Sequence, residues 1–366
     1  MIGSYTQAVT AEYLQRLWES FHTLFSMVLS SLSNAARFQF EPYSHSWVAL
    51  HPQPKGVIQF VGSALWGTFP TLVYRHFLKS LFSAGYTVVA LPFRFTLHHW
   101  STAIDLLDEH YTLRGSMVEA AMAKGYESAV YLNAANYTWI GHGLGCKYVA
   151  LLELLSSTEV LTECWQSLPP HDPSTRQLKE IQQGLSCLNA RLRLMEQRIQ
   201  RLTGQTVDYG LPSIMQQASL WLAPAIKVPV PAKLLRWVLS KLLTASPTVD
   251  QTHQLIAHSR LFHFTGLIQF ARDRNTANTC QQLMHEQPHI RRRFLKGNHL
   301  EPVGIQLGQC VVDFNPLDKF IQPLSCRDLE FNALALVHRL RNTPAVAQQR
   351  CDETCDASTT RHRIAA

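Results

Sequence analysis

The sequence predicts an α/β protein with a mostly parallel sheet, helices on both faces of that sheet and one long helical insertion. Three observations support this fold class. Short apolar runs alternate with helical segments along most of the chain, as they do in parallel sheets. A glycine-rich turn, GHGLG at 141–145, joins one apolar run to a helix. A heptad pattern from Leu178 to Leu202 interrupts the alternation.

The predicted sheet is built from apolar runs that end at glycine, proline or a polar turn. We expect strands over 57–61, 86–91, 138–140, 220–223 and 265–270. The helices expected between them cover 70–84, about 101–124 and 144–156. Gly85 ends the first of these helices and Pro92 stops the second strand. A sheet of this kind binds its ligand beyond the carboxyl ends of its strands.

The two ends of the chain differ from this core. No Asp, Glu, Lys or Arg occurs from Ser20 to Ala36, and apolar residues there fall on one helical face, so we predict an amphipathic N-terminal helix. Its many serines make it unsuited to span a membrane, and it either docks on the main domain or lies on a membrane surface. The polar C-terminal tail is predicted to be disordered. The predicted boundaries are 1–36 for the N-terminal helix, 37–156 and 214–342 for the two halves of the core, 157–213 for the helical insertion and 343–366 for the tail.

The insertion contains one long helix, predicted over 173–203 between an N-cap at Asp172 and a stop at Gly204. At about 1.5 Å per residue this helix is about 45 Å long. Its flanks carry Arg191 and Glu196, whose opposite charges suit pairing across a parallel dimer. The seam predicts either a lid that packs back on its own domain or a coiled coil with a second copy or another protein. All eight seam positions are apolar: Leu178, Ile181, Leu185, Leu188, Leu192, Met195, Ile199 and Leu202.

The turn at 141–145 has the frame G-x-S-x-G of a nucleophile elbow, in which a sharp strand-to-helix turn presents a serine above the sheet. Here the central residue is Gly143, which tolerates the turn but has no hydroxyl. Acyl-enzyme chemistry at this position is therefore excluded. A phosphate-binding loop is not predicted either, because the Walker lysine is absent and position 146 is Cys rather than Gly.

Two later residues lie where a hydrolase places its acid and its base. Asp273 follows the apolar run at 265–270, and His299 comes later, after a Gly-Asn pair. The order elbow, acid, histidine is the order of the α/β-hydrolase triad. Each residue alone has an ordinary explanation, since Asp273 suits a turn and the chain holds 17 histidines. Together they favour the hydrolase interpretation.

In such a site one backbone N–H of the oxyanion hole follows the first sheet strand, and the other follows the nucleophile. The oxyanion- and ligand-binding candidates are therefore Ser63, Ala64, Leu144 and His142. Ser63 is the nearest hydroxyl, and we interpret it as a turn residue rather than a nucleophile. Cys146, on the helix after the elbow, is interpreted as a packing residue.

The chain resembles a hydrolase-like family of unknown function within the α/β-hydrolase superfamily, found in cyanobacteria and plastids. The resemblance is carried by the segment FVGSALWGTFPTLVYRHFLKSLFSAGYTVVALPFRFTLHHW at 60–100, WIGHGLGCK at 139–147, LAPAIK at 222–227 and GNHLEP at 297–302, and it spans roughly 45–305. It implies an α/β-hydrolase-like fold, a photosynthetic-membrane setting, and Asp273 and His299 as remnants of a triad. The family pattern resembles GHSLGCK, so this chain departs from it at Gly143. It also has Glu301 where a Thr is usual.

Composition narrows the remaining possibilities. The net charge of +7 is modest and the basic residues form no long run, so no nucleic-acid partner is predicted. The eight cysteines include no C-x-x-C pair, and no secretory signal is recognised, which favours reduced thiols and no metal or other cofactor. We expect a cytoplasmic or stromal protein, in peripheral contact with the thylakoid membrane if the N-terminal helix binds lipid.

Two functions fit these observations. The first is a catalytically degenerate α/β-hydrolase fold that acts as a binding, scaffold or assembly factor, with a protein partner or a second copy on the helix at 173–203. The second is a hydrolase or lyase that needs no serine and uses an Asp273–His299 dyad on a small or lipid-like substrate. The missing hydroxyl at Gly143 favours the first function, while the retained order of acid and histidine favours the second.

Overall fold

A computed structural model describes residues 37–64, 66–94, 96–168, 175–215, 217–226, 246–259, 261–312 and 321–342. The chain divides into two compact units, 1–38 and 39–366, and the second unit contains every helix and strand among the described residues. The helix expected over 1–36, the tail expected over 343–366 and the N-cap expected at Asp172 lie outside the described residues.

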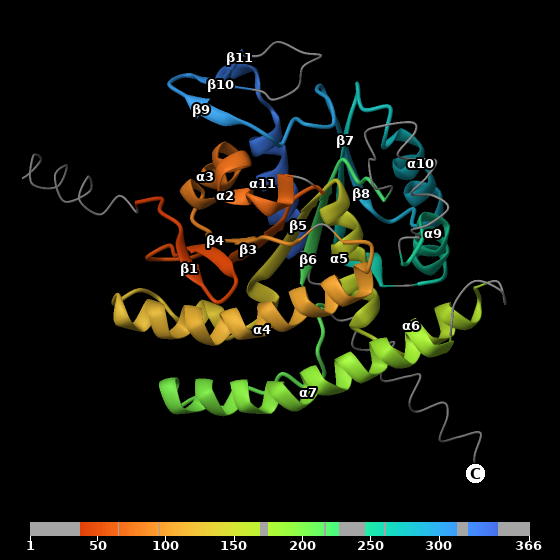
Figure 1. Ribbon diagram of the computed structural model, residues 1–366. Helices are drawn as coiled ribbons and strands as arrows, with labels where there is room; N and C mark the ends of the chain where they lie inside the picture. Colours follow the sequence, from red (N-terminus) through yellow and green to blue (C-terminus); the bar gives the residue numbers. More distant parts are fainter. Residues whose placement is uncertain are drawn as a thin grey trace, which may run out of the picture. The chain divides into compact units, whose positions relative to one another are not determined.

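A mixed sheet forms the centre of this unit (Figure 1). The strands are β1 (Glu41–Tyr43), β2 (Ser46–Ala49), β3 (Val57–Val61), β4 (Thr87–Leu91), β5 (Tyr137–His142), β6 (Ala218–Leu222), β7 (Thr265–Phe270) and β8 (Arg291–Leu295). Their order across the sheet is β1-β2-β4-β3-β5-β6-β7-β8. The pairs from β4 to β8 are parallel, and β1 and β2 join the edge antiparallel. The predicted mostly parallel sheet is confirmed, and all five expected strands belong to it.

Three strands of this sheet, β1, β2 and β8, are not expected from the sequence, and β8 shows why. In the sequence, residues Arg291 to Leu295 look like a basic cluster rather than a strand. In the structure they form the edge of the sheet, where most of their side chains are exposed. An edge strand pairs on one side only and can leave charged side chains in water. The strands β3 to β7 are buried at nearly every position and are mostly apolar, as helices on both faces of the sheet require.

Helices cover both faces of the sheet. On one face lie α3 (Arg75–Ser83), preceded by the short α2 (Pro70–Val73), and α11 (Leu329–Arg341); on the other lie α4 (His99–Ala123), α5 (Leu144–Leu155) and α9 (Val249–His258) (Figure 1). The expected helix over 70–84 is broken at Tyr74, which serves as the C-cap of α2 and the N-cap of α3. The remaining helices are α6 (Thr158–Gln166) and α10 (Ala277–Glu286), with 3₁₀ turns at Trp66–Thr68, Ala129–Tyr131, Ala134–Asn136, Phe262–Phe264 and Leu324–Cys326.

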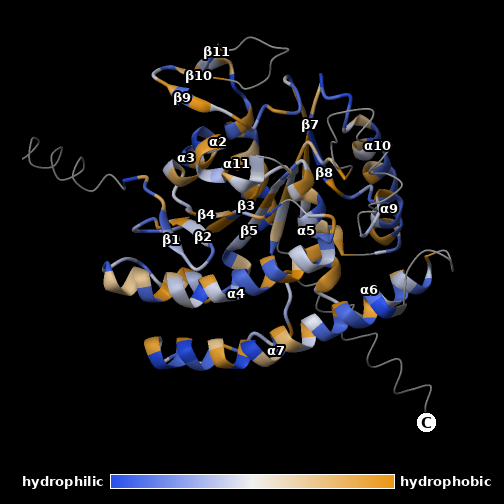
Figure 2. Ribbon diagram, viewed as in Figure 1, coloured by the Kyte–Doolittle hydropathy of each residue, from blue (hydrophilic) through white to orange (hydrophobic). Residues whose placement is uncertain are grey.

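The long helix of the insertion, α7 (Thr175–Thr203), packs alongside α4 (Figure 1). Figure 2 shows it as a largely hydrophilic helix on which apolar residues recur. Gly184 allows the two helices to approach closely, since a Cβ there would lie 2.9 Å from Ile104 Cδ1. The seam faces the core: Ile181, Leu185, Leu188, Leu192 and Ile199 are buried, and Leu178, Met195 and Leu202 are partly buried.

The charges that flank the seam are also used within the chain. Arg191 pairs with Asp108 of α4, and Arg198 pairs with Glu119 of the same helix. Glu196 accepts a hydrogen bond from the Tyr209 N–H at 2.7 Å. The apolar seam is thus covered by the protein's own core. Association of another chain with residues 173–203 is not tested by this packing and stays a prediction.

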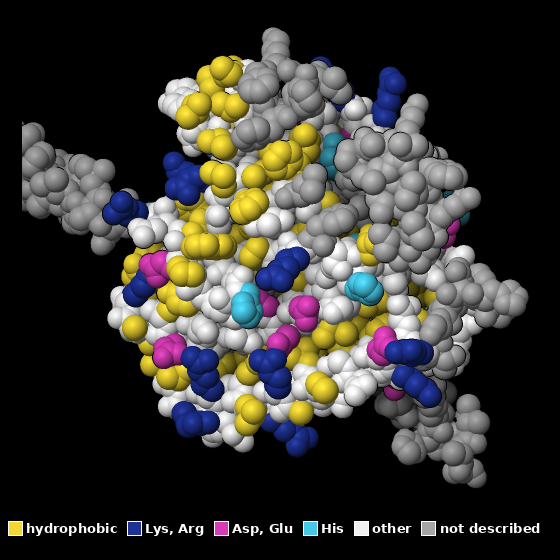
Figure 3. Space-filling view, in the orientation of Figure 1, with side chains coloured by type: hydrophobic (Ala, Val, Ile, Leu, Met, Phe, Trp, Pro, Cys, Tyr) yellow, Lys and Arg dark blue, Asp and Glu magenta, His cyan; other side chains and the backbone are white. Residues whose placement is uncertain are grey.

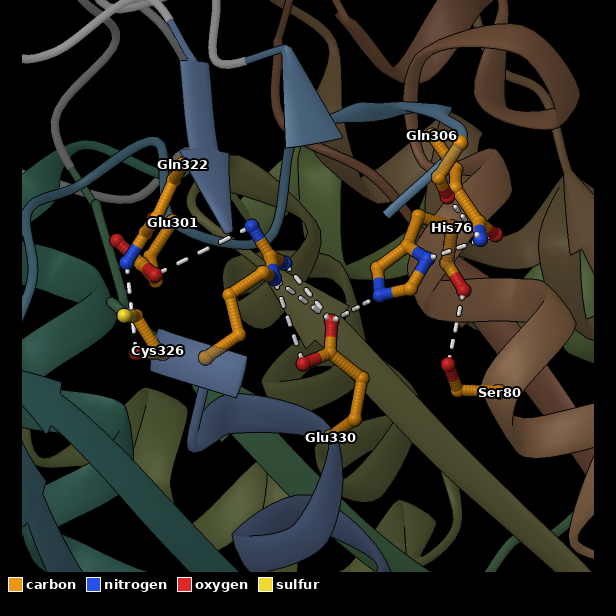
Figure 4. Close-up of polar contacts among 9 residues, drawn as sticks. His76, Ser80, Glu301, Gln306, Gln322, Cys326 and Glu330 are labelled. Carbon is orange, nitrogen blue, oxygen red and sulfur yellow. Dashed lines mark hydrogen bonds and ion pairs between the residues drawn. The ribbon is translucent and has the colours of Figure 1, made fainter. Parts of the chain in front are cut away.

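A small antiparallel sheet lies at one end of the central sheet, near α2 and α3. It consists of β9 (Ile305–Leu307), β10 (Cys310–Val312) and β11 (Ile321–Pro323). Buried Arg327 connects it to the core through Glu330, with Nη2 to Oε1 at 2.8 Å, and it lies 4.0 Å from Glu301 (Figure 4). His76 of α3 approaches Glu330 on the other side, at 3.6 Å. These polar contacts tie the loop after β8 to α3 and α11.

Candidate active site

The elbow backbone is present and has Gly143 at its centre. Gly143 follows β5, precedes α5 and has φ 55° and ψ −116°, a combination that L-residues adopt only under strain. The flanking glycine at 145 is required for a different reason, because a Cβ there would overlap the carbonyl oxygen of Val61 on β3. The G-x-G-x-G pattern therefore reflects one strained turn and one close approach of helix to strand.

Asp273 and His299 lie at the same end of the sheet. Asp273 follows β7 and His299 follows β8; these strands come after the elbow strand β5 in the sheet order β5-β6-β7-β8. His299 Nδ1 is 2.9 Å from Asp273 Oδ2, and the carboxylate also accepts from Thr276 Oγ1 at 2.5 Å and from the N–H of Asn275 at 3.1 Å. Burial alone would raise the pKa of Asp273, but the hydrogen bonds from His299 and Thr276 outweigh burial and hold this pKa below its ordinary value.

The ionised carboxylate determines which nitrogen of His299 carries the proton. A carboxylate only accepts hydrogen bonds, so His299 Nδ1 is protonated and Nε2 keeps its lone pair. Nε2 lies 3.5 Å from the point where a Cβ on Gly143 would stand. The side chain of His299 is 20% exposed and that of Asp273 is 0% exposed. The pair has the arrangement of a general base aimed at the elbow.

His142 is buried behind the elbow, and both of its ring nitrogens form hydrogen bonds within the chain. Its Nδ1 is 2.8 Å from Tyr74 Oη, and its Nε2 is 2.8 Å from the carbonyl oxygen of His299. Burial, together with the nearby His299, lowers the pKa of His142 to about 3, so the ring is neutral at pH 7. The carbonyl of His299 can only accept, so Nε2 donates to it and Nδ1 accepts from Tyr74. The Tyr74 hydroxyl in turn accepts the N–H of Ser63 at 2.9 Å.

The hydrogen bonds from Ser63 through Tyr74 to His142 leave only some of the nearby backbone N–H groups available to the site. The N–H of Ser63 is committed to Tyr74 and is not free for an oxyanion. The N–H groups of Ala64 and Leu144 donate to no other group in the part of the chain that the structure describes. Leu144 is the first residue of α5, where backbone donors lack an acceptor within the helix. Ala64 and Leu144 thus remain as the two candidates for oxyanion donors.

Sequence reasoning places each of these residues near the site but misses Tyr74. A tyrosine on a predicted helix gives no sign that its hydroxyl bridges two strand ends. Cys146 is buried and donates its thiol hydrogen to the carbonyl of Gly141 at 3.2 Å, which is a packing role. Among the described residues, no group of three or more His, Cys, Asp or Glu side chains could hold a metal ion.

Comparison with known families gives one match. Residues 39–167 match the model of a family described as "Protein of unknown function (DUF1350)". This region covers the sheet from β1 to β5, the elbow, α5 and α6. No curated protein sequence matches the chain.

Solved structures with related architecture include several esterases. Esterase B of Lactobacillus rhamnosis, inhibited by a tributyrin phosphonate, is 10% identical with a TM-score of 0.43 and coverage of 91% of this chain and 97% of that chain. Esterase 2 of Thermogutta terrifontis, phosphoramylated by tabun, is 13% identical with a TM-score of 0.42 and coverage of 84% and 96%. TT1662 from Thermus thermophilus is 10% identical with a TM-score of 0.39 and coverage of 84% and 99%. Identities and TM-scores this low carry no argument about activity.

The fold assignment stands on the chain's own geometry. A mostly parallel sheet carries the elbow after β5, the acid after β7 and the histidine after β8, in the chain order of the α/β-hydrolase triad. The fold is α/β-hydrolase-like. Within the described residues, no helix combines the length and the apolar character needed to cross a membrane.

Proposed function

We propose that this protein is an ester hydrolase that uses the Asp273–His299 pair as its general base. One observation carries the proposal: His299 Nε2, held by the Asp273 contact of 2.9 Å, lies 3.5 Å from the position of a Cβ on Gly143. An α/β-hydrolase needs its base at this position to take a proton from the attacking hydroxyl. A protein used only for binding has no chemical requirement for a hydrogen-bonded acid–base pair aimed at the elbow.

The backbone donors support the same proposal. The N–H groups of Ala64 and Leu144 flank the elbow, as donors to a developing oxyanion must. His299 takes the proton of the attacking hydroxyl and then delivers it to the leaving alkoxide, while Asp273 stabilises the imidazolium formed in between. The proposal requires no metal or other cofactor.

The exposed apolar surface of α2 and the small sheet suggests the class of ester. Figure 3 shows hydrophobic side chains gathered over α2 and the small sheet. Phe69 and Leu72 are 65% and 58% exposed at α2, and Leu307 and Ile321 are 63% and 58% exposed on the small sheet. An exposed apolar surface of this kind suits a substrate with a hydrocarbon chain. We therefore propose a lipid-like ester in preference to a charged metabolite.

The test is hydrolysis of p-nitrophenyl esters from acetate to palmitate by the full chain. His299→Ala and Asp273→Asn are expected to lower kcat/KM by about 10²- to 10⁴-fold, the usual contribution of a general base. His285→Ala, at an exposed histidine of α10, is the matched control and is expected to retain wild-type activity. A His299→Ala variant as active as the wild type would contradict the proposal.

A second candidate is a non-catalytic binding protein, and Gly143 is the observation that favours it. Glycine leaves the elbow without a nucleophile and without the strain of a serine at φ 55°. This candidate predicts that the wild type hydrolyses no ester on the panel and that His299→Ala leaves ligand or partner binding unchanged.

A further inference from the structure

Ser63 occupies the space that the nucleophile of the elbow would fill. A Cβ built on Gly143 would overlap Ser63 Oγ and would lie 2.9 Å from Ser63 Cβ. The same point lies 3.5 Å from His299 Nε2. A serine hydroxyl and the base of the site therefore converge on one position, even though the hydroxyl comes from the loop after β3 rather than from the elbow.

We infer that Ser63 is the nucleophile of this site and that the chain has a serine at the loop position in place of one at the elbow. The inference rests on the hydrolase function proposed above and names the group from which His299 takes its proton. Gly143 then leaves the space that the Ser63 side chain needs, because any larger residue at 143 would displace Ser63.

The hydrogen-bond relay behind the elbow holds the two reacting groups in one frame. The N–H of Ser63 donates to Tyr74, Tyr74 donates to His142, and His142 donates to the carbonyl of His299. All three of these hydrogen bonds are 2.8 or 2.9 Å long and are largely buried. Nucleophile and base are thus fixed relative to one another through their backbones, which leaves only their side-chain torsions to adjust.

Ser63 also has the freedom that a nucleophile requires. Its Oγ makes no hydrogen bond to any described group, including His299 Nε2, and the residue is 5% exposed. In hydrolases without bound substrate the contact between nucleophile and base is often long and tightens when substrate arrives.

The chemistry balances as an ordinary acyl transfer. Ser63 Oγ attacks the ester carbonyl carbon while His299 Nε2 takes the hydroxyl proton, and the N–H groups of Ala64 and Leu144 receive the oxyanion. The tetrahedral intermediate expels the alkoxide, which leaves as an alcohol with the proton from His299. Water, deprotonated by His299, then attacks the acyl-serine, and Ser63 recovers its proton as the carboxylic acid departs.

Labelling with a fluorophosphonate tests the inference on the full chain. The reagent is expected to modify the tryptic peptide 56–75, and fragmentation should place the adduct on Ser63. Labelling should disappear in Ser63→Ala and in His299→Ala but persist in Ser80→Ala, whose hydroxyl donates within α3 to the carbonyl of His76. Ser63→Ala is expected to lower ester hydrolysis by about 10³-fold or more, with an unchanged melting temperature as the check that it folds.

The outcomes separate this inference from the function on which it rests. If Ser63→Ala keeps wild-type hydrolysis while His299→Ala loses it, water attacks the ester directly and the inference is wrong, although the hydrolase function stands. If the wild type neither labels at Ser63 nor hydrolyses any ester on the panel, both are wrong. Ser63→Cys gives a second measurement, because a thiol at this position should retain hydrolysis and make it sensitive to iodoacetamide, unlike the wild type.

Discussion

Restoring a serine to the elbow should damage this protein rather than activate it. In Gly143→Ser the new Cβ overlaps Ser63 Oγ and stands 2.9 Å from Ser63 Cβ. Overpacking of this kind costs about 1–3 kcal/mol. The backbone at φ 55° and ψ −116° adds about 1–3 kcal/mol for any residue other than glycine. The free energy of unfolding should therefore fall by about 2–6 kcal/mol, and the melting temperature by about 4–12 °C for a domain of this size.

Thermal melts and ester hydrolysis of five proteins measure the effect: the wild type, Gly143→Ser, Ser63→Gly, the double variant and a Gly143→Ala control. Removing the Ser63 side chain relieves the overlap and leaves only the backbone strain, so the double variant should recover about half of the lost stability. Compared with Ser63→Gly, the double variant should also gain weak, His299-dependent hydrolysis, because the Cβ of the new serine stands 3.5 Å from His299 Nε2. Gly143→Ala controls for the added Cβ without a hydroxyl. A Gly143→Ser variant as stable as the wild type and hydrolysing esters at ordinary enzyme rates would refute the reasoning.

Three further predictions concern the packing and protonation of the core. The double variant Leu185→Glu with Leu192→Glu places two charges in the buried contact of α7 with α4. A thermal melt should show a large loss of stability, and light scattering should show an unchanged mass. The control Leu194→Glu, at a position that is 63% exposed, should change neither the stability nor the mass. Recovery of a smaller oligomer from an assembled wild type would show instead that the seam joins two chains. The pKa of His142 is about 3 in the folded state and 6.5 in the unfolded state, so between these pH values the unfolded state binds more protons. The free energy of unfolding should therefore fall as the pH drops from 6.5 towards 3. In urea titrations, His142→Gln should reduce this dependence by up to about 1.4 kcal/mol per pH unit. Arg327→Ala removes the buried cation that pairs with Glu330 and should cost about 3–5 kcal/mol in urea unfolding. An unchanged midpoint would mean that this ion pair does not stabilise the small sheet.

The local sequence determined the buried strands, the amphipathic helix α7 and the elbow turn. The strands β3 to β7 are mostly apolar because both faces of the sheet are covered, and such runs can be recognised without a structure. The seam of α7 is equally clear, since one face of a helix must be apolar to pack. The elbow can be recognised in the sequence because its turn and its close helix–strand contact require glycine. The order of Gly143, Asp273 and His299 can be taken directly from the sequence.

Tertiary structure decided everything that depends on which segments meet. The heptad seam fits a lid and a coiled coil equally well, and only the approach of α4 shows that the protein's own core covers it. The arginines of β8 resemble a surface cluster until the edge of the sheet gives them backbone partners. Most of all, the sequence places Ser63 and Gly143 eighty residues apart, in two separate turns. That the hydroxyl of one fills the space left by the other follows from the parallel pairing of β3 with β5, which brings the ends of both strands together.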